Sequence, residues 1–89
     1  FVISEITALS VVELLASHEI NAQIKWPNDI YVGSNKICGI LIENTLSGTD
    51  VRYSIVGVGL NVNQTSFDTS LPNPTSMAMC IALLPRRWL

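Results

Sequence analysis

The sequence predicts a small α+β domain in which a helix covers one face of a largely antiparallel sheet. Three observations lead to this prediction: an apolar repeat of helical period opens the chain, four runs of strand character follow it, and only short turns separate these runs. Antiparallel strands are joined by tight turns, whereas parallel strands need long crossovers, so the short turns favour hairpins. A helix packed on one face of such a sheet is typical of the α+β class.

Length and composition limit what this domain can be. The 89 residues allow one hydrophobic core, and 48% of them are hydrophobic while only 13% are charged. Intrinsic disorder is excluded, because it requires low hydrophobicity and high net charge. So few charges indicate surface that something else covers, since typical domains are about 25% charged. The net charge of −2 gives no electrostatic footprint for nucleic acid.

The sequence predicts neither a membrane segment nor a disulfide. The longest apolar run, residues 77–84, is far shorter than the roughly 20 residues of a transmembrane helix. No signal peptide is visible, and the opening at Phe1 resembles the interior of a longer chain. Cys38 and Cys80 lie in apolar runs without the spacing of metal ligands, which favours buried free thiols in a reducing cytosol.

The first helix is expected over residues 4–17. Ser4 is the expected N-cap, Glu5 suits the first turn, and His18 suits the C-terminal end of the helix dipole. Apolar side chains recur with a period near 3.6 and predict a stripe that faces the core. The stripe consists of Ile6, Leu9, Val12, Leu15 and Ala16, widened by Val11 and Leu14.

Four strands are expected next, each closed by turn residues. Their predicted ranges are residues 22–26, 30–32, 36–44 and 51–62. Residues 64–74 are predicted to form a loop. Thr75 or Ser76 then caps a short apolar helix that stops at Pro85.

The fourth predicted strand separates glycines and amides from aliphatic side chains. Alternation places Gly57, Gly59, Asn61 and Asn63 on one face, and Val56, Val58, Leu60 and Val62 on the other. The aliphatic face is expected in the core. Glycine inside a strand often marks where a ligand or another backbone comes close. If the third and fourth strands pair through the 45–50 turn, Gly39 falls opposite Gly57 and the glycines form a shallow trough. A barrel-like bend or tight helix packing explains them equally well.

The segment Lys25-Trp26-Pro27-Asn28-Asp29 holds a cation, an aromatic ring and a carboxylate on one stiff corner. The proline keeps Trp26 out of the helical region. The Asp29 carboxylate could hold Mg²⁺, which uses one or two carboxylates together with substrate phosphates. Ordinary turn chemistry also explains the asparagine and the aspartate.

Lys36 stands at the mouth of the third predicted strand. Its ammonium group can neutralise a carboxylate or a phosphate, or it can simply protect a sheet edge from aggregation. In simple alternation Lys36 points away from Gly39, so it reaches the trough only if the strand contains a bulge.

Three segments taken together resemble the biotin–protein ligases, a family also called biotin–[acetyl-CoA-carboxylase] ligases or holocarboxylase synthetases. They are Lys25-Trp-Pro-Asn-Asp-Ile30, Lys36-Ile-Cys-Gly-Ile-Leu-Ile-Glu43 and Gly57-Val-Gly-Leu-Asn-Val62. The resemblance covers about residues 1–76 and leaves residues 77–89 as an apolar tail outside it. It implies part of a catalytic domain of the class II aminoacyl-tRNA synthetase and biotin synthetase type.

Such ligases make biotinyl-5′-adenylate from biotin and MgATP, and then transfer biotin to one lysine of a biotin carboxyl carrier domain. The resemblance implies that Lys36 contacts biotin and the developing acyl-phosphate, where a fixed charge stabilises the transition state. It also implies that Asp29, with Asn28 beside it, lies near the phosphates and Mg²⁺, and that Lys25 adds charge there.

The resemblance likewise implies a pocket around the glycines. Gly39, Ile40 and Gly57 correspond to positions at the biotin site, where a large side chain at either glycine would block the rings. Leu60 corresponds to an apolar wall, and Asn61 to an asparagine that hydrogen-bonds the adenine edge.

The family's glycine- and arginine-rich phosphate loop is expected upstream of Phe1 and is not in this sequence. We therefore expect a cytoplasmic ligase fragment that is inactive on its own and binds neither nucleic acid nor membranes. Self-association into a homodimer through a sheet edge near residues 43–53 is also expected. A non-catalytic remnant that binds biotin or only self-associates, and a relative of the lipoate–protein ligases, are the alternatives.

Overall fold

The computed structural model describes residues 2–83, except for the side chains of residues 51 and 52. Its elements are helix α1 (Val2–Ala16), strands β1 (Gln23–Lys25), β2 (Asp29–Val32), β3 (Asn35–Ser47) and β4 (Asp50–Leu60), and helix α2 (Met77–Ala82). The predicted α+β class is confirmed, and each predicted strand is present with its ends within three residues of the prediction.

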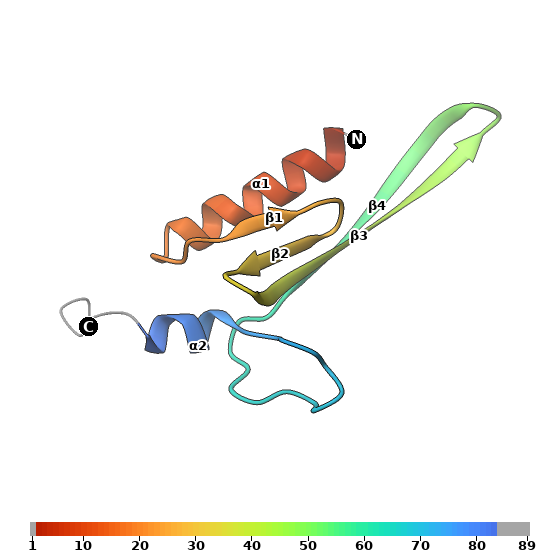
Figure 1. The fold of residues 1–89 in the computed structure, drawn as a ribbon. Helices are drawn as coiled ribbons and strands as arrows, with labels where there is room; N and C mark the ends of the chain where they lie inside the picture. The colour runs from red at the N-terminus through yellow and green to blue at the C-terminus, as the bar shows by residue number, and fades with distance from the viewer. Residues whose placement is uncertain (1, 84–89) are drawn as a thin grey trace.

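The four strands form one antiparallel sheet in the order β1-β2-β3-β4, as the short turns predicted. Strands β3 and β4 are much longer than the other two, and together they form a hairpin arm that extends away from the rest of the molecule (Figure 1). The molecule is therefore elongated, measuring 55 × 30 × 19 Å along its principal axes.

Helix α1 begins earlier than predicted, and the face that it buries overlaps the predicted stripe only at Val11, Val12 and Leu15. It starts at Val2, so the prediction of Ser4 as its N-cap is wrong. Ile6 and Leu9, which were predicted in the core, have 60% and 54% of their surface exposed. The residues that α1 buries are Ala8, Val11 and Leu15. Apolar residues occur all around this helix, so their period alone does not single out one face.

The chain leaves α1 through a Schellman motif. Glu19 has a positive φ of 63°, and its N–H donates to the carbonyl of Ala16 at 3.0 Å. The N–H of Ile20 reaches back to the carbonyl of Leu15 at 2.9 Å, and the side chains of Leu15 and Ile20 are both buried. This hydrogen-bond pair with its apolar contact ends a helix and redirects the chain. Here it directs the chain into β1, under the helix.

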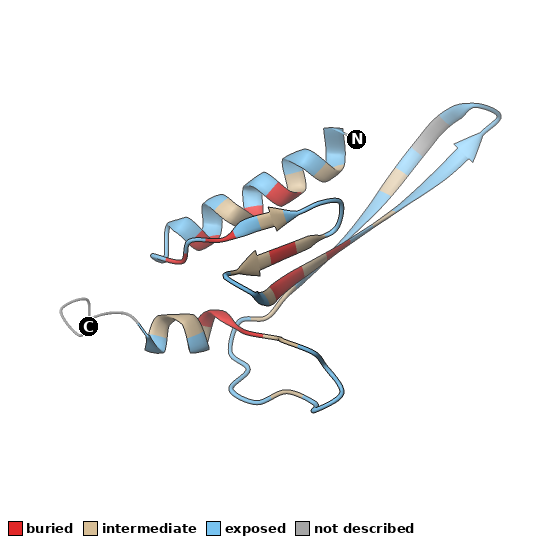
Figure 2. Cartoon of the chain, viewed as in Figure 1, coloured by how far each residue is buried: buried red, intermediate tan, exposed pale blue. Residues whose placement is uncertain are grey.

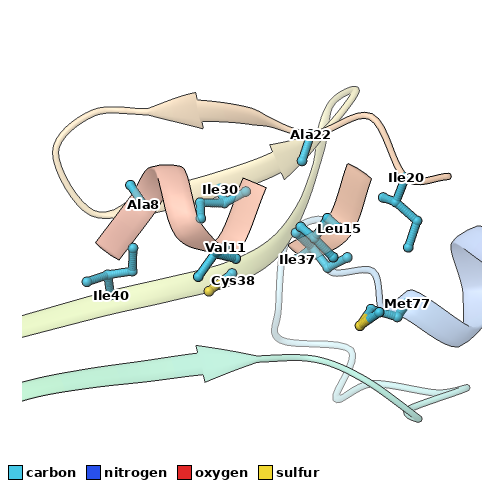
Figure 3. Packing of buried hydrophobic residues seen from close by; sticks show 10 residues of the cluster. All are labelled: Ala8, Val11, Leu15, Ile20, Ala22, Ile30, Ile37, Cys38, Ile40 and Met77. Carbon is cyan, nitrogen blue, oxygen red and sulfur yellow. The ribbon is translucent and has the colours of Figure 1, made fainter. Parts of the chain in front are cut away.

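The core lies between α1 and the base of the sheet. Figure 3 shows the ten buried hydrophobic side chains, which come from α1, the segment between α1 and β1, β2, β3 and the start of α2. Figure 2 shows that buried residues gather in this region, whereas the described residues of the outer part of the hairpin arm are mostly exposed. One face of the sheet base is therefore closed by α1, and the opposite face is left open.

The aliphatic face of β4 is not in the core, contrary to the prediction. Val56 and Val58 have 37% and 46% of their surface exposed, and only Leu60 packs against the core. The physical reason is the position of α1, whose main contacts with the sheet are with β1 and β3. The outer strand lies beyond the reach of the helix.

After β4 the chain makes the predicted loop and returns to β3, where Pro74 forms an isolated parallel bridge with Lys36. Ser76 caps α2 as predicted, because its side chain accepts a hydrogen bond from the N–H of Met79 at 3.2 Å. The predicted stop at Pro85 lies outside the described residues. Among the described helices, none has the length and apolar character needed to cross a membrane.

Candidate functional site

A β-bulge brings Lys36 to the same face of the sheet as Gly39. Opposite β2, the register changes so that Ile30 pairs with Cys38 while Tyr31 pairs with Lys36, which leaves Ile37 as an extra residue. Neighbouring strand residues normally point to opposite faces, yet Ile37 and Cys38 are both buried. Lys36 and Gly39, which flank this pair, therefore both face the open side of the sheet. The sequence predicted that Lys36 reaches the trough only if the strand contains a bulge, and this bulge is present.

The open face of the sheet presents two rows of residues across the strands, because directly paired residues share a face. The first row is Lys25, Asp29, Gly39 and Gly59. The second row is Gln23, Tyr31, Lys36 and Pro74. In the first row, charged side chains thus lie on β1 and β2 and glycine backbone lies on β3 and β4, while the second row adds the Lys36 side chain from β3.

The register of the glycines differs from the prediction by two residues. Gly39 pairs with Gly59, and Gly57 pairs with Leu41. The predicted pairing of Gly39 with Gly57 is therefore wrong, although all three glycines do share the open face. Two features together account for the shift: the turn closes with Ser47 paired to Asp50, and the register changes by one further residue between Thr45 and Leu46.

The fold itself does not require these glycines. A Cβ atom built on Gly59 would lie 3.7 Å from the carbonyl oxygen of Gly39, and one on Gly57 would lie 3.7 Å from that of Leu41. These are ordinary van der Waals distances, so alanine would fit without displacing a neighbour. No packing contact among the described residues therefore requires these glycines, and close approach of a ligand is kept as a hypothesis for them.

Lys36 and Asp29 form an ion pair at the edge of this floor. The Lys36 Nζ lies 2.9 Å from the Asp29 Oδ1, and the two side chains are 44% and 35% exposed. The lysine also extends over Gly39, since a Cβ built there would be 3.6 Å from both Cε and Nζ. A positive charge is thus held directly above bare backbone. An exposed pair of this kind adds little stability.

We name the resulting hollow the glycine trough and define it by Asp29, Lys36, Gly39, Gly57 and Gly59. Its volume is about 540 Å³, and Asn28 contributes to its lining. A second hollow of about 420 Å³ continues from Lys36, Gly39 and Gly59 to Asn61 and the loop residues 71–74. The two share three lining residues, so they form one elongated depression with the lysine near its middle.

The remaining predicted residues lie around this depression in different ways. The Ile40 side chain is buried in the core, and its N–H donates to the Asn28 carbonyl at 2.7 Å, so it contributes backbone only. The Leu60 side chain packs against the core on the opposite face, so it does not form the predicted apolar wall. Asn61 does line the depression, and its Nδ2 donates to the Thr75 carbonyl at 3.1 Å.

Lys25 lies in the same row as Asp29, but its side chain contacts the Tyr31 ring. Its Nζ lies 5.0 Å from the centroid of the Tyr31 ring, which is a cation–π distance. Tyr31 was not predicted as a site residue, and neither were Asn73 and its neighbours in the returning loop. The loop's Pro72 and Pro74 mark a rigid segment, but no local sequence signal shows that it returns to β3.

The trough offers one carboxylate for a metal ion. The described residues contain no group of three or more His, Cys, Asp or Glu side chains that could hold one. Asp29 therefore does not form a metal site by itself, but it fits a Mg²⁺ ion that arrives bound to phosphates, the usual mode for this ion.

Cys38 lies behind the trough on the core face. Burial raises the pKa of its thiol above the ordinary range, while the Lys36 ammonium acts in the opposite direction and the Asp29 carboxylate adds to the increase. Both cysteines are free, as predicted. A thiol that stays protonated is a poor nucleophile, so Cys38 is a core residue.

A third hollow lies between the start of α1 and the hairpin arm. It is larger, about 650 Å³, and is lined mainly by apolar residues that include Ile3, Trp26 and Leu41. The glycine trough is the better candidate site because charged groups and open backbone converge there, whereas Glu5 is the only charged residue lining the third hollow among the described residues.

Comparison with known proteins gives a consistent result. The profile of the Biotin/lipoate A/B protein ligase family matches residues 1–61. The bifunctional ligase/repressor BirA of Bacillus spizizenii is 44% identical over 64 residues, covering 71% of this chain and 20% of that protein. The human biotin–protein ligase is 36% identical over 69 residues, covering 72% of this chain and 9% of that protein.

A solved structure agrees with these sequence relatives. The crystal structure of the biotin protein ligase from Aquifex aeolicus superposes with a TM-score of 0.66 at 34% identity, covering 90% of this chain and 36% of that one. The chain thus spans about a fifth or less of the curated relatives cited here and about a third of the solved structure.

Proposed function

The chain belongs to the biotin/lipoate A/B protein ligase family, and from this premise we propose that its glycine trough is part of a site where biotin is activated and transferred. The proposed reaction joins biotin to the α-phosphate of ATP, giving biotinyl-5′-AMP and pyrophosphate. A lysine ε-amine of a carrier domain then displaces AMP. The observation that carries this proposal is the bulge, which holds the Lys36 ammonium above the Gly39 backbone.

Lys36 is the proposed catalytic residue for the first step. As a biotin carboxylate oxygen attacks the α-phosphorus, negative charge accumulates on the phosphate oxygens and the P–O bond to pyrophosphate breaks. A fixed ammonium group near these oxygens stabilises the transition state more than the ground state. In the structure this ammonium is paired with Asp29. We propose that the substrate's negative charge replaces that partner.

The floor and the ends of the depression have separate proposed roles. Gly39, Gly57 and Gly59 leave room for the fused rings of biotin to lie against the backbone. Asn61 and residues 71–74, at the other end, lie where the adenylate would extend. Asp29 and Asn28 would face the phosphates, and Mg²⁺ held there would offset their charge.

Whole-protein properties are part of the same proposal. We propose the carrier domain of a biotin-dependent carboxylase as the acceptor, and the cytoplasm, where the free thiols of Cys38 and Cys80 persist, as the compartment. We also propose that copies of the chain pair through the hairpin arm. There β4 is an outer strand of the sheet, and Leu46, Tyr53 and Ile55 are each more than half exposed.

A segment exchange tests the activity. Residues 1–76 would replace the corresponding segment of the Bacillus subtilis bifunctional ligase/repressor, which is 41% identical over 64 residues. We expect biotin-dependent exchange of pyrophosphate into ATP, reduced strongly by Lys36→Ala and much less by Lys25→Ala. A chimera with native circular dichroism but no biotin-dependent exchange would overturn the proposal. Exchange that depends on lipoate instead would assign the chain to the lipoate branch, and biotin binding without exchange would indicate a remnant.

A further inference from the structure

The returning loop takes the place of a strand beside Lys36. Pairing between β3 and β4 ends where Cys38 meets Leu60. Beyond that point the same edge of β3 is occupied by residues 73–75, which we name the strap. The Lys36 N–H donates to the Asn73 carbonyl at 2.8 Å, and the Thr75 N–H donates to the Lys36 carbonyl at 2.9 Å.

This arrangement is a parallel bridge centred on Pro74. A parallel bridge uses the carbonyl before the central residue and the N–H after it, so the missing N–H of proline costs nothing here. Both main-chain polar groups of Lys36 are therefore bonded to the strap. On its other side the same residue is paired with Tyr31 of β2 at the bulge.

Asn73 attaches the strap at a second point. Its Nδ2 donates to the carbonyl of Ser34, in the turn that leads into β3. Asn73 thus holds β3 and its turn at two points: its side chain binds Ser34, and its main-chain carbonyl binds Lys36.

The far end of the strap is anchored in the core. Ser76 is fully buried, and its Oγ donates to the Gln64 carbonyl at 2.5 Å while accepting from the Met79 N–H. Asn61 adds the bond from its Nδ2 to the Thr75 carbonyl at 3.1 Å. The strap is therefore fixed from the loop, from the end of β4 and from the start of α2.

We infer that Asn73 is a positioning residue for Lys36, holding the main chain at the bulge so that the Nζ stays above Gly39 and against Asp29. A lysine side chain has large rotational freedom, and an unsupported bulge at the end of a strand would add to it. Only the consequence for catalysis rests on the proposed function, because the contacts of the strap are independent of any reaction.

The test uses the two lysines of this sequence, Lys25 and Lys36, as an internal pair. Limited acetylation with acetic anhydride, measured by peptide mass spectrometry well below the unfolding temperature, gives the ratio of modification at Lys36 to that at Lys25. Asn73→Ala should raise this ratio about fivefold, the effect of losing one hydrogen bond. Asn73→Gln, which keeps an amide donor, should restore most of the protection. Thr69→Ala, in the same loop, should change nothing.

Hydrogen exchange gives a second measurement. The amide protons of Lys36 and Thr75 should be protected in the parent chain and should exchange faster in Asn73→Ala, while the Leu15 amide in α1 should not change. An unchanged acetylation ratio together with unchanged protection would overturn the inference. So would an increase in exchange across the whole molecule, because that would show a merely structural role.

The catalytic consequence is tested separately in the chimera described above. Asn73→Ala should lower kcat for pyrophosphate exchange about fivefold with little change in KM for biotin, again the effect of one lost hydrogen bond. If the acetylation ratio responds but no variant shows biotin-dependent exchange, the positioning role stands and the proposed function fails. If exchange occurs but neither the ratio nor kcat responds to Asn73→Ala, the proposed function stands and the positioning role fails.

Discussion

Alanine at position 59 should leave the fold intact while blocking the trough. The added Cβ would lie 3.7 Å from the Gly39 carbonyl oxygen, so nothing in the protein has to move. Glycine in a strand interior costs about 0.5–1 kcal/mol relative to alanine, so the free energy of unfolding of Gly59→Ala should rise by about that amount. A ligand lying on the trough floor would meet the new methyl group. Overpacking of this kind costs about 1–3 kcal/mol, so affinity for biotin should fall about 5- to 150-fold.

Urea denaturation measures the first quantity, and calorimetric titration with biotin measures the second. Gly48→Ala is the matched control, because Gly48 lies at the tip of the hairpin arm with a φ of +64°, and a Cβ added there would have no neighbour within 4 Å. It should show the opposite pattern, with stability lowered by about 1 kcal/mol and affinity for biotin unchanged. The reasoning is refuted if Gly59→Ala binds biotin like the parent chain, or if it unfolds at lower urea concentration.

Three further predictions follow from the same structure. Lys36→Ala should reduce adenylation in the chimera by about 10- to 100-fold, the value of a charge-assisted hydrogen bond. The same variant should lower the free energy of unfolding by less than about 1 kcal/mol, because the ion pair of Lys36 with Asp29 is partly exposed. Wild-type kinetics in this variant would contradict the catalytic role and leave Lys36 as a residue that protects the sheet edge. Burial raises the pKa of the Cys38 thiol, so as the pH rises this thiol ionises in the unfolded chain before it does so in the folded one. The free energy of unfolding should therefore be unaffected below about pH 8.5 and should decline as the pH rises toward the raised pKa. In denaturation curves Cys38→Ala should flatten this decline and Cys80→Ala should not, and equal slopes in both variants would contradict the assignment. Light scattering at micromolar concentration should detect a dimer of the chain that Ile55→Lys dissociates, whereas a species of 9.7 kDa in the parent would reject self-association.

The elements were predictable because their signals are local. Turn residues separated the strands, and the position before an apolar run predicted Thr75 or Ser76 as a cap, of which the structure uses Ser76. The face that α1 buries was predictable only in part: Val11 and Leu15 belong to the predicted stripe, but apolar residues surround the helix and only the packed sheet adds Ala8. The exposure of Val58 likewise depends on how far the helix reaches across the sheet.

The site was predictable as a set of residues but not as a geometry. Alternation put Gly57 and Gly59 on one face, and that placement is confirmed. The sequence showed only that Lys36 needs a bulge in order to reach the trough, and it did not place the bulge. Ile37 and Cys38 are both apolar, and their types do not show which of them is the extra residue. The strap at Asn73 depends on a bridge to Lys36, far away along the chain, and no local pattern encodes such a contact.

The central claim, that the glycine trough is part of a biotin site, is tested most directly by titrating the ¹⁵N-labelled chain with biotin. The account predicts that the amide resonances of Gly39, Gly57 and Gly59 shift in a saturable manner, that ATP shifts Lys36 and Asn61, and that lipoate at the same concentration has a smaller effect on the glycines. Resonances at the glycines that remain unchanged at saturating biotin, or shifts confined to the third hollow around Trp26, would contradict it.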